Sequence, residues 1–405
     1  MTPSETREGG WVPLGVTLGI QAMVAMALLT LPVMAPQVAR SLQVAPSMVG
    51  AYVSMSYLGA MAASLLGGSA SRRWGAIRVS QAGLVLCALG LLLCAVPWLP
   101  AMALGAVLIG LGYGPITPAS SHVLARTTPA HRLSLVFSLK QTGVPVGSML
   151  AGALVPSLML ALDWQHSLVL VALACVVCAV VSQPLRAGLD DDRTGVATPG
   201  ATGPLASLRL VLSHPALSTL AACSFLFSMV QMSLTTYLVT FLHQDLGYGL
   251  VGAGLVLAFV QMGGVGGRIA WGFLADRWLG ALPMLMALAA VMAASALGTT
   301  ALESDTPRWV VVALLVVFGA SAIGWNGVYL AEVARRAPPG QAGVATGGTL
   351  ACTFLGVVLG PLIFGLLSEA FGAYRGGFAV LAGVALISGA LLWRAWRQAP
   401  VNAQA

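Results

Sequence analysis

Apolar residues gather in twelve long stretches that are separated by short polar segments. A helix needs about 20 apolar residues to cross the hydrocarbon core of a bilayer, and each stretch is near that length. The stretches are mostly too uniform for a β-barrel, whose strands alternate with a period of two. The pattern predicts an all-α membrane protein with 12 transmembrane helices, at residues 12–36, 47–68, 79–98, 101–125, 134–160, 167–183, 215–241, 249–272, 280–300, 309–333, 342–367 and 375–393.

The longest polar break falls near the middle of the chain. It contains a run of acids, Asp190 to Asp192, followed by Pro199 and Gly200. Such a composition is typical of a turn-rich linker. We therefore expect two six-helix halves, residues 1–183 and 215–405, joined by a cytoplasmic linker at residues 184–214.

Composition and charge support a membrane location. Hydrophobic residues make up 58% of the chain and charged residues only 8%, whereas soluble domains carry roughly 25% charged residues. The net charge of +7 does not require a nucleic-acid partner. Membrane proteins concentrate positive residues on their cytoplasmic side, and the arginines of this chain can be explained in that way. With both termini in the cytoplasm, that side holds fourteen arginines: Arg7, Arg72, Arg73, Arg78, Arg126, Arg132, Arg186, Arg193, Arg209, Arg277, Arg335, Arg336, Arg394 and Arg397. The outer side holds three: Arg40, Arg308 and Arg375.

Enzymatic and cofactor signals do not emerge from the sequence. The six cysteines all lie in apolar stretches, and the CxxC of Cys175 and Cys178 has no second pair, so we interpret them as small buried hydrophobes. The sequence contains no P-loop, so ATP-driven transport is not indicated. No His, Cys or acid cluster has metal-ligand spacing. We expect no cofactor, no metal and no enzyme.

The two halves carry a repeated loop. Gly68, Arg73 and Trp74 recur 204 residues later as Gly272, Arg277 and Trp278. The segment from Gly272 through Phe273, Leu274, Ala275, Asp276, Arg277 and Trp278 to Gly280 resembles the signature loop between helices 8 and 9 of the major facilitator superfamily. The resemblance covers essentially the whole chain and implies a carrier made of parallel repeated halves.

The first copy of the loop departs from the family pattern. In the family an aspartate at this position pairs across the cytoplasmic gate. Here the position holds Arg72, which places that gate contact of the first half in doubt, while Asp276 keeps the aspartate of the second half. An aspartate beside arginines at a helix end can form a switchable ion pair. The sequence thus predicts gating residues Arg72, Arg73, Asp276 and Arg277, with positive-inside topology as the alternative role of the arginines.

Two cations lie inside the predicted helices, while all twelve acids lie in loops or near helix ends. Lys140 follows Arg132 by eight residues, and Arg268 precedes Asp276 by eight, so each lies about 12 Å from the cytoplasmic surface at 1.5 Å per residue. This depth is close to the middle of the membrane. Helices 5 and 8 belong to opposite halves and pack together in the facilitator fold, so the two cations are expected to share a cavity. Placing two cations inside a membrane without an acid nearby is energetically costly. This cost suggests that an anion from solution, the substrate, pairs with them.

Each cation has a second interpretation. Lys140 is the only lysine in the chain, which favours a role for a compact ammonium, but it could also extend to the cytoplasmic surface. Arg268 lies four residues before Gly272, which resembles the helix-8 arginine of oxalate/formate antiporters and monocarboxylate porters, where that residue binds the substrate carboxylate. An arginine that bonds helix-end carbonyls is the alternative.

Further polar residues in the helices are candidates to shape the pocket. Helices 1, 4, 7 and 10 line the cavity in the facilitator fold. The predicted pocket residues are Gln141, Tyr113, Gln231, Trp325 and Asn326, and Gln21 and Gln261 also lie within helices. For each of them an interhelical hydrogen bond or simple packing is the alternative. Pro115, Pro118, Pro145 and Pro361 are expected to kink their helices.

The function hypothesis is a secondary carrier for a small organic anion, namely a carboxylate, that works by alternating access as a proton symporter or an anion exchanger. The alternative is a multidrug/proton antiporter, although helix 1 lacks an acid and two cations would repel a cationic drug. Carriers of neutral solutes and a membrane sensor or enzyme are further alternatives. We expect a monomer in a bacterial inner membrane, in contact with the lipid bilayer, an anionic small molecule and, for symport, protons, without nucleic acid.

Overall fold

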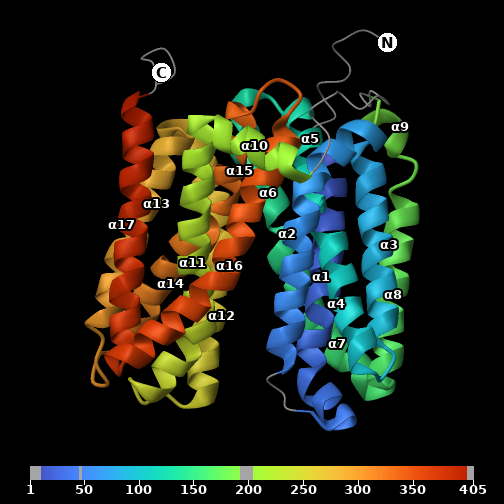
Figure 1. Ribbon diagram of the computed structural model, residues 1–405. Coiled ribbons are helices and arrows are strands. Elements are labelled where there is room, and N and C mark those ends of the chain that lie inside the picture. The colour runs from blue at the N-terminus through green and yellow to red at the C-terminus, as the bar shows by residue number, and fades with distance from the viewer. Residues whose placement is uncertain (1–10, 45–47, 192–203, 399–405) are drawn as a thin grey trace. The chain divides into compact units, whose positions relative to one another are not determined.

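A computed structural model describes residues 11–44, 48–191 and 204–398. These residues form helices joined by short turns, and no strand occurs among them. The elements are α1 (Trp11–Leu42), α2 (Met48–Trp74), α3 (Ala76–Cys94), α4 (Leu99–Tyr113), α5 (Ile116–Thr127), η2 (Ala130–Arg132), α6 (Leu133–Gln141), α7 (Gly143–Ala161), α8 (Trp164–Val181), α9 (Arg186–Leu189), α10 (Pro204–Ser213), α11 (Pro215–Gln244), α12 (Leu250–Leu274), η3 (Ala275–Leu279), α13 (Ala281–Thr300), α14 (Arg308–Gly324), α15 (Asn326–Arg336), α16 (Ala342–Phe371) and α17 (Tyr374–Gln398) (Figure 1).

Eleven helical segments in the described residues are long and apolar enough to cross a membrane. The remaining long helix, α2, has 27 residues but contains more serine and glycine than the others. It corresponds to the predicted span 47–68. The predicted all-α membrane fold is thereby confirmed, while the orientation of the termini stays a prediction.

Three membrane-crossing segments are each built from two helices. Pro115 has no N–H to continue the helix, and α4 accordingly ends at Tyr113 before α5 begins at Ile116. Pro145 removes the donor that the Gln141 carbonyl would need, and the chain breaks at Thr142 between α6 and α7. The third break, at Trp325 between α14 and α15, has no proline.

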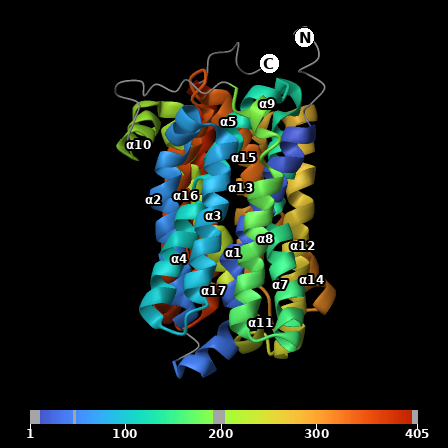
Figure 2. The ribbon, with the colours of Figure 1, turned by 90° about the vertical axis from the view of Figure 1, so that its right-hand side faces the viewer.

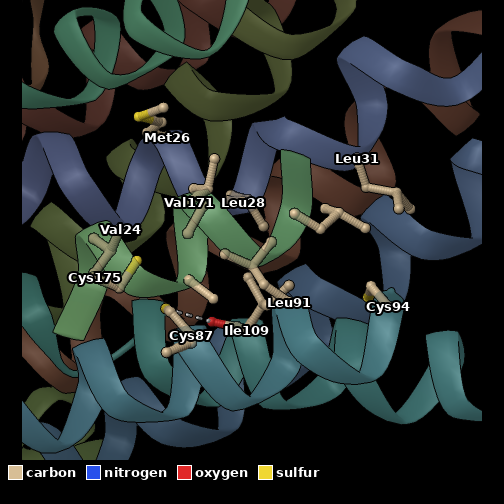
Figure 3. Packing of buried hydrophobic residues seen from close by; sticks show 14 of the residues in the cluster. Val24, Met26, Leu28, Leu31, Cys87, Leu91, Cys94, Ile109, Val171 and Cys175 are labelled. Carbon is tan, nitrogen blue, oxygen red and sulfur yellow. Dashed lines mark hydrogen bonds between the residues drawn. The ribbon is translucent and has the colours of Figure 1, made fainter. Parts of the chain in front are cut away.

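One compact unit consists of residues 1–129, 139–213 and 333–351. In it α1 packs against α7 and α8, and α3 packs against α4 and α8 (Figure 2). The side chains between them form an apolar core that includes Val24, Leu91, Ile109 and Val171, each at most 2% exposed (Figure 3). Cys87 and Cys175 belong to this core as buried small side chains, and no disulfide links the six cysteines.

The second compact unit consists of residues 130–138, 214–332 and 352–405. Within it α12 packs against α14, while α17 packs against α11 and α13. Each unit thus contains short segments from the other sequence half. The expected division into residues 1–183, 184–214 and 215–405 stays a prediction, and within that linker the structure describes the short helices α9 and α10.

Candidate functional site

The ammonium group of Lys140 lies inside the first unit among side-chain oxygens. The residue is the second-last of α6, two positions before the break at Thr142, and is only 1% exposed. Its Nζ donates to Gln21 Oε1 at 2.8 Å, to Thr117 Oγ1 at 3.2 Å and to Gln141 Oε1 at 3.3 Å. Thr117 Oγ1 also donates to Gln21 Oε1 at 3.0 Å. Residues of three helices, α1, α5 and α6, therefore converge on one buried cation.

Glycine brings α1 close enough for this arrangement. A Cβ at Gly143 would lie 2.8 Å from the Leu18 carbonyl oxygen and 2.9 Å from Gln21 Cβ. Any larger residue would push α1 away from the start of α7. The close packing of small residues is a common way for membrane helices to approach each other. Gly143 thus sets the distance at which Gln21 reaches Lys140.

The carboxylates described in the first unit are engaged at helix ends. Asp163 caps α8 by accepting the His166 N–H at 2.8 Å, and this hydrogen bond holds the pKa of Asp163 below its ordinary value. Asp190 accepts the backbone N–H groups of Ile77 and Arg78 at 2.8 and 3.1 Å. Asp191 pairs with Arg126. These acids lie at helix termini, as the sequence indicates.

A second polar cluster lies in the other unit and joins three of the predicted pocket residues. Gln231 Oε1, on α11, accepts from Trp325 Nε1 at 3.1 Å and from Asn326 Nδ2 at 3.3 Å. Trp325 is fully buried and packs edge-on against Phe227. The break between α14 and α15 therefore presents an aromatic ring and an amide beside the glutamine.

Arg268 is also buried, at 4% exposed, and it contacts the same helix break. Its Nε donates to the Ile323 carbonyl oxygen at 3.1 Å, and Asn326 Nδ2 lies 3.4 Å from that oxygen. The break removes the regular helical partner of such a carbonyl, so the arginine serves at least this structural role. The contact also fixes the plane of its guanidinium group.

Two residues of the lysine cluster were not among the predicted site residues. Gln21 is among the further polar candidates of the sequence, and Thr117 is not among them. The sequence signal for Thr117 is its position directly after the Pro115 break, where a polar side chain follows a helix interruption. Tyr113, which was predicted to line the pocket, is partly buried against the apolar core of the first unit. Its pocket role stays a prediction.

Asp276 occupies a capping position in the second unit. Its Oδ1 accepts the Ser134 N–H at 3.1 Å and its Oδ2 accepts the Leu135 N–H at 2.7 Å. These are first-turn amides of α6, which are otherwise without helical acceptors. The signature-loop aspartate thus ties the π-helical turn η3 to the start of α6.

The arginines of the two loops lie near the surface of their units. Arg73 and Arg277 are exposed, and the Arg73 guanidinium lies 5.5 Å from the centre of the Trp74 ring. Arg72 is partly buried. Next to the first loop it is Asp190, from the end of α9, that caps the start of α3. The gating roles of Arg72, Arg73, Asp276 and Arg277 stay predictions.

Comparison with known proteins identifies the class. Residues 17–352 match the family model of the Major Facilitator Superfamily. Human monocarboxylate transporter 11 is 31% identical over 356 residues, covering 82% of this chain and 71% of that protein. A chloroplastic sodium-dependent phosphate transport protein of Arabidopsis thaliana is 25% identical, covering 86% of this chain and 71% of its own length. The crystal structure of the E. coli fucose:proton symporter superposes with a TM-score of 0.78 at 17% identity, covering 97% of this chain and all of the other.

The chain belongs to the Major Facilitator Superfamily. It is accordingly a multi-pass membrane transporter and not an enzyme, and the expected membership of this superfamily is confirmed.

Proposed function

We propose that the protein is a secondary carrier that moves a small organic anion, a carboxylate, across a bacterial inner membrane by alternating access. The observation that carries this proposal is the buried ammonium of Lys140. It lies within hydrogen-bond distance of the Gln21 and Gln141 amide oxygens and of the Thr117 hydroxyl. Removing an ammonium from water is costly, and its retention inside a transporter favours a functional role.

The charge of the site favours an anion over a cation. Lys140 brings a positive charge into the first unit, and the described acids of that unit bind helix ends and Arg126 instead. A lipophilic cation would meet electrostatic repulsion at such a position. The names of two relatives, a monocarboxylate transporter and a phosphate transport protein, support transport of an anion.

Arg268 is proposed as a second residue that binds the carboxylate. Its Nε contact with Ile323 orients the guanidinium, and a guanidinium matches the two oxygens of a carboxylate. Gln231, Trp325 and Asn326 form one hydrogen-bonded group that would shape the pocket. The carrier would work either as a proton symporter or by exchange of one anion for another.

The test is thermal stabilisation of the purified protein by a panel of acetate, L-lactate, pyruvate and benzoate, with sugars and lipophilic cations beside them. A ligand that binds only the folded protein stabilises it by about 2.7 kcal/mol at 100 times its Kd. Lys140→Met keeps the apolar stem and removes the charge. We expect it to weaken carboxylate binding by about thirtyfold or more, because it removes one partner of a buried charged pair.

Arg268→Lys is the companion variant, since it keeps the charge but removes the planar fork. We expect reduced carboxylate affinity, with a loss of stability of about 1 kcal/mol because the hydrogen bond to Ile323 is also removed. Stabilisation by lipophilic cations that is undiminished in both variants, together with no response to any carboxylate, would contradict the proposal.

A further inference from the structure

The side-chain amide of Gln21 is satisfied on one side only. Gln21 lies on α1 and is fully buried. Its Oε1 accepts from both Lys140 and Thr117, at 2.8 and 3.0 Å. Its Nε2 is also buried, yet within the described residues it meets no hydrogen-bond acceptor.

The orientation of this amide follows from the chemistry of its neighbour. An ammonium group has only donors, so the atom of Gln21 that faces Lys140 at 2.8 Å must be the oxygen. Exchanging the oxygen and the nitrogen would place two donors against each other. The N–H groups of Nε2 therefore belong on the other side of the amide carbon, beside the ammonium but not bonded to it.

A buried N–H without an acceptor is unfavourable and calls for an explanation. Gln81 on α3, another buried glutamine of the same unit, shows the usual solution. Its Nε2 donates to the Ala179 carbonyl oxygen and to Gln183 Oε1, both at 2.9 Å. In Gln81 the buried atom without a hydrogen-bond partner is the oxygen Oε1. In Gln21 it is the donor Nε2, next to a cation.

We infer that Gln21 is a specificity-determining residue that donates its amide N–H to the carboxylate of the transported anion. The inference rests on the proposed function. A carboxylate has two acceptor oxygens in one plane, so one oxygen can accept from Lys140 while the other accepts from Gln21 Nε2. Access to the buried amide requires a conformation in which the site opens, as alternating access provides. The pair selects anions with two adjacent oxygens over anions that offer a single acceptor.

The experiment compares Gln21→Leu with Gln81→Leu, which makes the same change at a buried glutamine away from the lysine. Dissociation constants are measured by thermal shift for L-lactate, pyruvate and benzoate, and for thiocyanate as an anion without a carboxylate. Loss of one hydrogen bond to a charged group corresponds to about a tenfold to hundredfold change in Kd. We expect that loss in Gln21→Leu for the carboxylates, an unchanged Kd for thiocyanate, and parental values in Gln81→Leu.

Other outcomes overturn the inference. Parental carboxylate affinity in Gln21→Leu would show that the amide makes no contact with the anion. An equal loss for carboxylates and thiocyanate would show that Gln21 only positions Lys140. If Gln21→Leu cannot be purified, Gln21→Asn withdraws the amide by one methylene group and is expected to give the same selective loss. In either case Lys140→Met tests the proposed function separately, because it should weaken every anion.

Discussion

Individual charged side chains in this protein occupy two kinds of environment. Lys140 and Arg268 are buried and contact neutral oxygens. Asp163, Asp190 and Asp276 instead accept backbone N–H groups at helix starts. The acids thus use the partial positive charge of helix N-termini, whereas the two cations donate to side-chain and backbone oxygens.

Asp245 differs from the other acids, because part of its carboxyl group is buried without a hydrogen-bond partner in the described residues. It lies in the turn after α11. Burial raises its pKa above the ordinary value, although Arg375 and the Tyr374 N–H act in the opposite direction. Its neighbourhood is a cavity of about 610 Å³ in the second unit, lined also by Tyr237, Tyr374 and Glu369.

The pKa of Asp245 predicts a pH-dependent effect of Asp245→Asn. A carboxyl whose pKa is higher in the folded than in the unfolded state favours folding while it is protonated, and that contribution is lost as the pH rises through the folded value. The neutral variant should therefore have a higher thermal midpoint than the parent at pH 7, and the gain should shrink toward pH 4. Thermal scans at pH 4, 5.5 and 7 measure it, with the exposed Asp305→Asn as control. A gain that does not change with pH would contradict the assignment.

At the residue scale the sequence predicts the cations but not their neighbours. Lys140 and Gln141 are recognisable because they are polar within an apolar span. The contact of Lys140 with Gln21, 119 positions away, depends on which faces of α1 and α6 meet. An all-round apolar helix carries no periodic pattern that would reveal this, because lipid and protein interior are equally apolar.

Helices in this chain are interrupted beside several of the proposed site residues. Thr117 lies beside the break at Pro115, and Lys140 lies beside the break that Pro145 causes. At the third break, Trp325 donates to Gln231 and the Ile323 carbonyl accepts from Arg268. Prolines predict the first two breaks, since each removes a helical donor. The third could not be predicted from a proline. Conversely, α16 continues as one helix through Pro361, so a proline in a membrane helix does not by itself interrupt it.

The approach of α1 to α7 predicts different effects for two glycines of one helix. A Cβ at Gly147 would overlap the carbonyl oxygen of Ala22, whereas a Cβ at Gly152 would meet nothing within 4 Å. Gly147→Val should therefore destabilise the protein by about 1–3 kcal/mol through overpacking. Gly152→Val should leave the thermal midpoint nearly unchanged. Unfolding of the two purified variants in the same detergent measures the difference, and equal midpoints would show that α1 and α7 do not pack this closely.

At the scale of the whole molecule, the sequence predicts the class of protein correctly. Twelve apolar stretches, a loop repeated after 204 residues and a signature aspartate lead to the Major Facilitator Superfamily. The apolar stretches can be recognised in the sequence because the thickness of the membrane sets the length of each helix. The bilayer also requires that backbone groups form hydrogen bonds within the protein, which favours helices. Substrate identity depends instead on a few side-chain contacts, which leave little trace in overall composition.

The arginines predict the orientation of the molecule in the membrane, and two single cysteines can test it. Gly188, on α9, is exposed and lies between Arg186 and Arg193, so it should face the cytoplasm. Ala301, exposed in the turn after α13, should face outward. In a variant whose six native cysteines are replaced by alanine, Ala301→Cys should react with a membrane-impermeant maleimide in intact spheroplasts. Gly188→Cys should react only after permeabilisation. The cysteine-free parent gives the background, and labelling of Gly188→Cys in intact spheroplasts would reverse the orientation of both termini.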